Sequence, residues 1–196
     1  MIVPPNNLQS CTPDVRIARP CDLSFVMDVS KRETYAIGFI PRFAMQRKIE
    51  LGRILLGQEN DCEAGFLHYG SFRAPEVRIF QSAIRYDARR RGLALAMVES
   101  LVSTCRANGN VAISLRCLEE LEANAFWEAA GFVRIAQEPG RRGTLNVWVR
   151  PINPGKVTIE SRVQRCRKCG RPTPHLWTAG GKRWSLCPDC LLLPTA

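Results

Sequence analysis

The 196-residue sequence has no apolar run close to the roughly 20 residues that a membrane-spanning helix needs. Its first residues lack a basic stretch followed by an apolar one, so we expect no secretory signal and no membrane partner. Low-complexity tracts and internal repeats are also missing. With 45% hydrophobic and 23% charged residues, the composition is globular, and a cytoplasmic protein is the expectation.

Cysteine, by contrast, is abundant: there are nine. They do not form the pattern of a disulfide scaffold, because four lie in two Cys-x-x-Cys pairs near the C-terminus and five are scattered. Free cysteine packs like a small hydrophobic residue, so we interpret the scattered thiols as buried and unpaired. The scattered residues are Cys11, Cys21, Cys62, Cys105 and Cys117.

The two Cys-x-x-Cys pairs are separated by 17 residues. This spacing predicts one Zn²⁺ ion held by four thiolates, with no coordination position left open, and therefore a structural site. A redox role is the alternative. The module resembles a zinc ribbon. We divide the chain into an N-terminal extension (1–13), a main domain (14–152) and this ribbon (156–196), with metal ligands Cys166, Cys169, Cys187 and Cys190.

Positive charge is concentrated in the same module. The chain has a formal net charge of +10, and residues 156–196 contain eight lysines or arginines against two acidic residues. Aromatic residues such as Trp177 and Trp184 are interspersed with them. Basic and aromatic side chains together suit a nucleic-acid strand, since they contact phosphates and stack on bases. Binding a protein, or bracing the neighbouring domain, is the other interpretation.

The main domain has the alternation of an α/β protein. Hydrophobic periodicity and turn residues predict the order β-α-α-β-β-β-α-β-α-β-β and hence a mixed sheet flanked by helices. The expected strands are 15–18, 53–58, 64–69, 77–85, 111–117, 132–136 and 145–149, and the expected helices are 22–31, 41–51, 93–107 and 123–130, with 34–40 as a connection.

The stretch 84–94 joins a strand end to a helix through a basic turn, Arg89-Arg90-Arg91-Gly92. At a helix start the first N–H groups have no internal partner and the helix dipole is positive. The small Gly92 and Ala94 would let a phosphate approach the backbone, and arginines would add charge-assisted bonds. A solvated basic turn is the alternative interpretation.

This stretch resembles motif A of the GNAT superfamily of acyl-CoA-dependent N-acetyltransferases, a strand end followed by R/Q-x-x-G-x-G/A and a helix. Arg89, Gly92 and Ala94 fill that pattern. The later segment 124–132, NAFWEAAGF, is similar to the family's motif B. The resemblance covers about residues 14–150 and implies a GNAT-like mixed sheet, with acetyl-CoA in a V-shaped opening beside the motif A strand. The cofactor-binding residues it implies are Ser82, Ala83, Ile84, Arg89, Arg90, Arg91, Gly92, Leu93, Ala94, Asn124 and Trp127.

The resemblance leaves the proton transfers open. Where many members have a tyrosine acid, this chain has Trp127, whose indole N–H is no usable acid at neutral pH. Tyr86 or Tyr69 is a substitute, or the thiolate leaves unaided, or the chemistry is lost. Gln81 is expected to hold a water, and His68 has the intrinsic pKa of a general base, with Glu76 and Glu120 as further candidates. The expected catalytic residues are Gln81, His68 and Tyr86.

These observations predict an acyl-CoA-dependent N-acyltransferase with acetyl-CoA as cosubstrate, structural Zn²⁺ and an amine acceptor on a protein or nucleic acid. One alternative is a nucleic-acid base-modifying enzyme on the same fold. Another is a non-catalytic protein that binds nucleic acid or protein. The resemblance is also compatible with an oligomer, since family members often dimerise.

Overall fold

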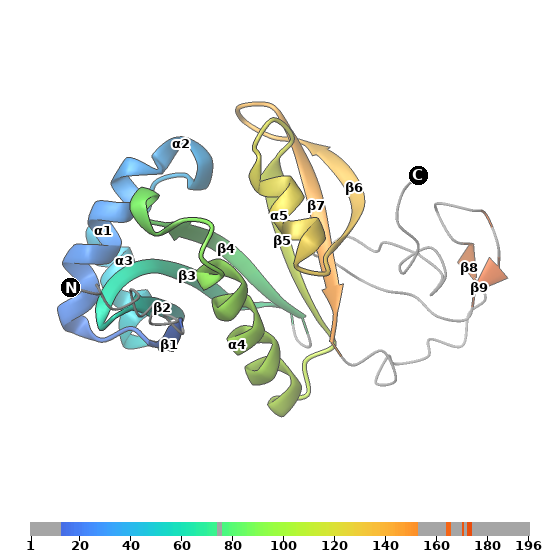
Figure 1. Ribbon diagram of the computed structural model, residues 1–196. Coiled ribbons are helices and arrows are strands. Elements are labelled where there is room, and N and C mark those ends of the chain that lie inside the picture. Colours follow the sequence, from blue (N-terminus) through green and yellow to red (C-terminus); the bar gives the residue numbers. More distant parts are fainter. Residues whose placement is uncertain (1–12, 74–75, 153–163, 166–169, 171, 174–196) are drawn as a thin grey trace, which may run out of the picture.

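The computed structural model describes residues 13–73, 76–152, 164–165, 170 and 172–173. Its main feature is a seven-stranded mixed sheet of order β1-β2-β3-β4-β5-β7-β6 with helices on both faces (Figure 1). No helix in the described ranges is long and apolar enough to cross a membrane. The strands are β1 (Asp14–Ile17), β2 (Ile54–Glu59), β3 (Cys62–Arg73), β4 (Glu76–Ile84), β5 (Ala112–Leu118), β6 (Val133–Pro139) and β7 (Thr144–Pro151); the helices are α1 (Leu23–Arg32), α2 (Thr34–Ile37), α3 (Arg42–Glu50), α4 (Leu93–Ala107) and α5 (Ala123–Ala129).

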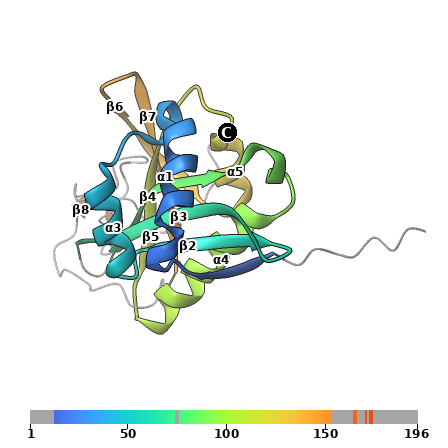
Figure 2. The same ribbon diagram turned by 90° about the vertical axis from the view of Figure 1, so that its left-hand side faces the viewer.

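Two hydrophobic cores lie on opposite faces of the sheet. Helices α1 and α3 cover one face around Phe66 and Met45, and α4 covers the other (Figure 2). The predicted stripe of α4 is confirmed, because Leu93, Met97 and Leu101 are all buried. Helix α5 shares the core of α4 through Trp127. Amphipathic helices of this kind are stabilised mainly by burying their apolar stripe.

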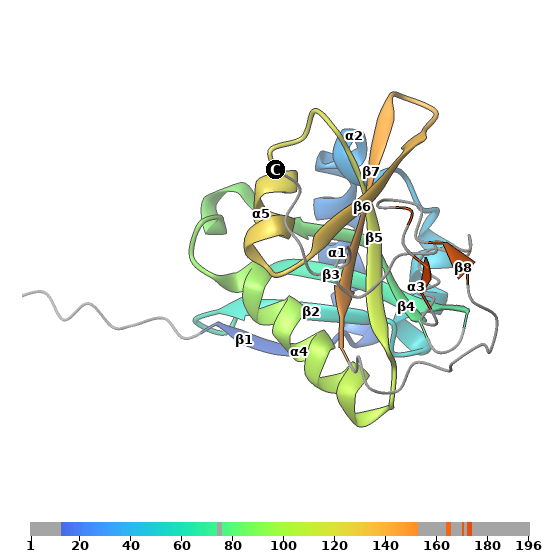
Figure 3. The ribbon, with the colours of Figure 1, turned by 90° about the vertical axis from the view of Figure 1, so that its right-hand side faces the viewer.

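The sheet opens between its two central strands. β4 and β5 are parallel, and they pair only from Glu76–Arg78 to Ala112–Ser114. Beyond that point β5 pairs with β7 alone, and β4 pairs with β3 alone. The two strands accordingly lie together at one end and diverge toward the other (Figures 1 and 3). Within the described ranges, the backbone edges that face the opening therefore have no strand partner across it.

A β-bulge marks β4 where it leaves β5. Tyr69 pairs with Ile79 and His68 pairs with Gln81, so Phe80 is the extra residue on β4. A bulge bends its strand and redirects the neighbouring side chains. This irregularity contributes to the divergence of β4 from its parallel partner.

The structure differs from the sequence-based expectation at three places. Residues Thr34–Ile37 form the short helix α2, which the sequence analysis treated as a connection. Pro41 is the N-cap of α3 rather than its first helical residue. The first hairpin is tighter than expected, because Asn60 and Asp61 both take positive φ, as the two central residues of a type I′ turn do. The other expected helices and strands are present, although β3 is twice as long as the expected strand 64–69. Of the scattered cysteines, Cys105 and Cys117 are buried as expected, whereas Cys21 and Cys62 are exposed.

Several predictions fall on residues outside the described ranges. These are the N-terminal extension up to residue 12 and all four expected zinc ligands, Cys166, Cys169, Cys187 and Cys190. Near the first pair, Gln164–Arg165 (β8) forms a two-residue antiparallel ladder with Pro172–Thr173 (β9). Among the described residues no group of three or more His, Cys, Asp or Glu is arranged to hold a metal ion.

Candidate functional site

The site begins at the turn between β4 and α4. Arg90 and Gly92 both adopt left-handed backbone conformations, with φ of 64° and 83°. Gly92 is the N-cap of α4, and a Cβ added there would meet no atom within 4 Å. The first N–H groups of a helix lack internal partners and lie at its positive end. The turn therefore presents backbone donors to an open space that an anion can enter.

Two of the three arginines in this turn are held by protein groups. Arg89 forms an ion pair with Glu33, and its Nε donates to the Ile84 carbonyl over 3.1 Å. Arg91 Nη1 lies 2.7 Å from a carboxylate oxygen of Glu59. Both guanidinium groups therefore fix the turn to the preceding elements as well as adding positive charge.

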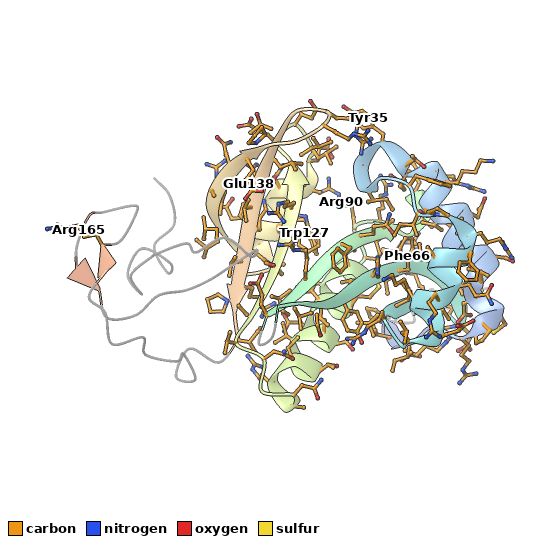
Figure 4. The ribbon with its side chains drawn as sticks, turned by 180° about the vertical axis from the view of Figure 1, so that it is seen from behind. Tyr35, Phe66, Arg90, Trp127, Glu138 and Arg165 are labelled. Carbon is orange, nitrogen blue, oxygen red and sulfur yellow. The ribbon has the colours of Figure 1, made fainter. Side chains whose placement is uncertain are left out.

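Arg90 differs from its neighbours. Its side chain is 88% exposed, and its contact with a carboxylate is a loose one, 3.5 Å from Nη2 to Glu122 Oε2. Exposed ion pairs of this length contribute little energy. In Figure 4 Arg90 is seen between the β2–β4 part of the sheet and the part formed by β5 and β7. Of the three arginines it is the one that can turn toward an incoming phosphate at the smallest cost.

A cavity of about 310 Å³ occupies the opening between the diverging halves of β4 and β5. It combines an apolar lining with a few polar groups, which is the usual character of a small-molecule site. The lining comes from α2, β4, β5, α5 and the β6–β7 turn. It consists of Ala36, Ile37, Gly38, Ile79, Phe80, Gln81, Ser82, Leu115, Arg116, Cys117, Leu118, Leu121, Ala123, Trp127, Arg141, Arg142 and Leu145.

Gln81 supplies a buried polar atom to this cavity. Its Nε2 donates to the carbonyls of Ile37 and Gly38, at 3.0 and 3.2 Å. Its Oε1 is buried without a hydrogen-bond partner. A buried unpaired acceptor costs about 1–3 kcal/mol. The amide is therefore oriented by α2, and its oxygen has no hydrogen-bond partner among the described residues.

The far rim of the cavity is formed by contacts that the sequence analysis missed. The Tyr35 hydroxyl on α2 donates to a carboxylate oxygen of Glu120, in the loop before α5. The Arg142 guanidinium lies 5.4 Å from the centre of the Tyr35 ring, and its Nη1 donates to the Thr34 carbonyl. These contacts join α2, across the opening, to the loop before α5 and to the β6–β7 turn. The sequence signals were the basic turn 139–143 and the candidate carboxylate Glu120, whose partners cannot be read from the chain.

Trp127 and Cys117 lie side by side on the cavity lining. Trp127 is buried on α5 and packs edge-on against Phe126 and Phe132, with ring centroids 4.9 and 5.4 Å apart. Cys117 is buried on β5. Burial raises the pKa of its thiol to about 11, and a hydrogen bond from the Trp127 side chain lowers it in part. The indole therefore fills the space at the expected acid position, and a protonated thiol lies next to it.

The structure places two expected catalytic residues outside the cavity lining. His68 is buried, its ring centroid lies 5.0 Å from that of Phe80, and its Nδ1 has no hydrogen-bond partner. Burial, with a smaller effect of Lys48, lowers the His68 pKa to about 4, so the imidazole is neutral and weakly basic. Tyr86 is 83% exposed, with the Arg89 guanidinium over its ring.

The side-chain amide of Asn124 is engaged in hydrogen bonds with the protein itself. Its Nδ2 donates to the carbonyls of Leu118, Glu119 and Leu121, at 2.8, 3.1 and 2.8 Å. Its Oδ1 accepts from the side chains of Asn146 and Trp148, each at 3.0 Å. The amide thus caps the end of β5 and fixes the start of α5. Of the other expected cofactor contacts, Ser82 lines the cavity, Ala83 packs under α1 and α3, and Ile84 lies against the core beside α4.

Solved structures share this architecture. The chain is similar to Ard1 of Thermoplasma volcanium, with 19% identity and a TM-score of 0.65 over 71% of this chain and 97% of the other. It is also similar to the ribosomal-protein-S18-alanine N-acetyltransferase of Escherichia coli, with 20% identity and a TM-score of 0.60 over 72% of this chain and 94% of the other. A third similar structure is yncA of Salmonella typhimurium, solved with its cofactor acetyl-CoA, with 15% identity and a TM-score of 0.65 over 75% of this chain and 98% of the other. At these identities the likeness concerns the fold.

No curated protein sequence matches the chain. The model of the acetyltransferase (GNAT) family matches residues 23–132, which is over half of the sequence. That range contains the bulged β4, the Gly92 turn, α4, β5 and α5. The chain belongs to the GNAT family of acetyltransferases.

Proposed function

We propose that this protein transfers an acetyl group from acetyl-CoA to an amine. The observation that carries the proposal is the position of the cavity. It lies between the separated halves of β4 and β5, and the Arg90–Glu122 pair connects the turn before α4 to α5, which borders the cavity. A long donor with a phosphate group at one end and a reactive thioester at the other fits this arrangement. The alternatives of a base-modifying enzyme and a binding protein gain no comparable support.

The donor would be held mainly by backbone. The N–H groups that begin α4 at Gly92–Ala94, with Arg90 beside them, suit its pyrophosphate. The edge of β4 from Ser82 to Ile84 has no partner across the opening and can take the amides of an extended arm, as in strand addition. Ser82 lies on the cavity lining, where the arm would end.

The acceptor would enter from the rim formed by α2 and the β6–β7 turn. We propose that the Gln81 Oε1, a buried acceptor with no partner among the described residues, accepts a hydrogen bond from the amine or from a water that takes the amine's proton. A cavity of about 310 Å³ admits one small group rather than a large molecule. We therefore propose that the acceptor presents an amine at the end of a larger chain, with a protein N-terminus as the first candidate.

Calorimetry with acetyl-CoA, followed by transfer of labelled acetyl to peptides with free N-terminal amines, tests this proposal. We expect micromolar donor binding and labelled peptide. Gln81→Ala should slow transfer while donor binding is kept, and Arg47→Ala, an exposed α3 residue, serves as the matched surface control. Absence of donor binding at tens of micromolar, or equal transfer by the Gln81 variant, would contradict it.

A separate proposal concerns the C-terminal module. We propose that Cys166, Cys169, Cys187 and Cys190 hold one structural Zn²⁺, because their spacing is that of a four-thiolate site and the first pair lies in the sequence between the paired strands β8 and β9. Metal analysis should give one zinc per chain, lost in Cys166→Ser but kept in Cys62→Ser, an exposed free thiol. A zinc-free wild-type protein would refute the site.

The basic character of this module raises the question of a nucleic-acid partner. If it binds DNA or RNA, affinity should fall steeply with salt and disappear on removing 156–196. Unchanged binding after that truncation would locate any nucleic-acid contact elsewhere.

A further inference from the structure

Acetyl transfer leaves a sulfur that needs a proton. When an amine attacks a thioester, the carbon–sulfur bond breaks and its electron pair remains on sulfur as a thiolate. The tyrosines considered as acids lie elsewhere: Tyr86 is exposed outside the cavity, and the Tyr69 hydroxyl donates to the Gly52 carbonyl over 3.0 Å. Neither phenol belongs to the cavity lining. We therefore look for the proton donor among the groups that line the cavity.

Few lining groups can donate a proton to a thiolate. Arginines, here Arg116, Arg141 and Arg142, do not deprotonate in proteins. The indole of Trp127 donates hydrogen bonds but keeps its proton. The aliphatic hydroxyl of Ser82 is far less acidic than a thiol. Among the described lining residues this leaves the S–H group of Cys117.

The position of Cys117 fits that task. It lies on β5 beyond Ser114, the last residue paired with β4, so it borders the opening itself. It lines the same cavity as Gln81, whose buried Oε1 has no hydrogen-bond partner among the described residues. The unpaired oxygen independently marks this cavity as a place where a polar ligand binds. A reacting group between β4 and β5 would have the amide on one side and the thiol on the other.

We infer that Cys117 is the proton donor to the leaving sulfur, an inference that rests on the proposed acetyl transfer. The acceptor nitrogen bonds to the carbonyl carbon, the carbon–sulfur bond breaks, and the Cys117 S–H proton moves to the departing thiolate. The resulting Cys117 thiolate recovers a proton from the one that the nitrogen releases, through water. The products are the amide and free CoA thiol, and no oxidant or further reactant is needed.

The electrostatics support an acid rather than a nucleophile. Burial raises the Cys117 pKa to about 11, which keeps the thiol protonated at neutral pH. Only a thiolate attacks a thioester efficiently. The same burial disfavours charge on the departing sulfur, so the leaving thiolate gains proton affinity in the same cavity. The Trp127 indole beside Cys117 takes the place of a second acid and leaves the thiol as the sole candidate among the described lining residues.

The test compares two buried cysteines. Cys117→Ala removes the thiol from the cavity, and Cys105→Ala removes an equally buried thiol of the same core that lies outside it. With acetyl-CoA and short peptides carrying free N-terminal amines, we expect kcat of Cys117→Ala to fall about 100-fold, at the lower end for loss of a general acid. Its KM and calorimetric affinity for acetyl-CoA should be unchanged, and Cys105→Ala should keep wild-type kcat.

Rescue separates chemistry from packing. Adding Trp127→Tyr to the Cys117→Ala protein supplies a phenol next to the lost thiol and should restore at least a tenth of the wild-type kcat. Wild-type kcat in Cys117→Ala, an equal loss in Cys105→Ala, or an acetylated Cys117 in intact-mass spectra would each overturn the inference while leaving the proposed function standing. A wild-type protein that neither binds acetyl-CoA nor transfers acetyl would refute both.

Discussion

Arg90 and Glu122 connect the two sides of the opening. Arg90 lies in the turn before α4, Glu122 is the N-cap of α5, and their side chains are 3.5 Å apart. The two side chains are 88% and 93% exposed, so this pair is screened by solvent and contributes little to stability. It nevertheless occupies the guanidinium that the phosphate of the proposed donor would use. The carboxylate therefore competes with an anionic ligand for Arg90.

The first prediction follows from this competition. Arg90→Ala should weaken acetyl-CoA binding about tenfold, because one charge-assisted bond to phosphate is lost. Glu122→Gln should strengthen binding two- to threefold by releasing Arg90. Calorimetry at low and high salt checks both, since the two effects should shrink as salt rises. Arg47→Ala on α3 is the control. Weaker binding by Glu122→Gln would mean that the carboxylate positions Arg90 rather than competing for it.

The second prediction concerns Gly92. Its φ of 83° is left-handed, and an added Cβ would meet no atom within 4 Å. Gly92→Ala should therefore cost only the conformational strain, about 1–2 kcal/mol of unfolding free energy. Gly92→Asn should cost less, because asparagine tolerates this conformation better. Urea unfolding of the three proteins checks the order. Equal stability of wild type and Gly92→Ala would show that the turn adjusts to a negative φ.

The sequence was informative about Gly92 because the signal there is local. A glycine between a strand and an apolar helical stripe needs no distant partner to be interpreted, and the predicted start and buried face of α4 are confirmed. The hairpin around Asn60–Asp61 was likewise predicted from its turn residues, although its turn is tighter than expected. Patterns of period 2 and 3.6 express such local geometry directly.

The rim of the cavity could not be predicted from the sequence, because the contacts that form it are long-range. Tyr35 meets Glu120 and Arg142 only because the diverging sheet brings α2 opposite elements about 85 and 107 residues away. The divergence itself depends on how few residues of β4 and β5 pair. Neither is encoded in a local pattern. His68 shows the same limit, since its type suggested a base whereas its burial lowers the pKa to about 4.

The third prediction separates structure from cofactor binding at Asn124. Its amide is engaged by three carbonyls and by the side chains of Asn146 and Trp148. Asn124→Ala should lower unfolding free energy by about 3 kcal/mol, because several part-buried polar groups lose their partners. At a temperature where the variant is folded, acetyl-CoA affinity should remain within threefold of wild type. A tenfold loss of affinity with unchanged stability would instead assign Asn124 to the cofactor.

The fourth prediction uses the pH dependence of stability. The His68 pKa is lowered to about 4 by burial, whereas in the unfolded chain it is near 6.5. Between these values the unfolded state binds more protons, so the free energy of unfolding should fall as pH drops. Because the shift spans about two and a half pKa units, the full effect is on the order of 3 kcal/mol. Above pH 7 the group should have no influence.

Urea unfolding at pH 7.5 and pH 5.0 measures this effect. His68→Gln removes the titrating imidazole, so its loss of stability between the two pH values should be about 2 kcal/mol smaller than that of wild type. The lowered pKa of Asp22, which follows from its hydrogen bond to Arg16, acts only below its ordinary value near 3.8 and does not contribute in this window. An identical pH dependence in wild type and His68→Gln would show that the imidazole is not kept neutral by burial.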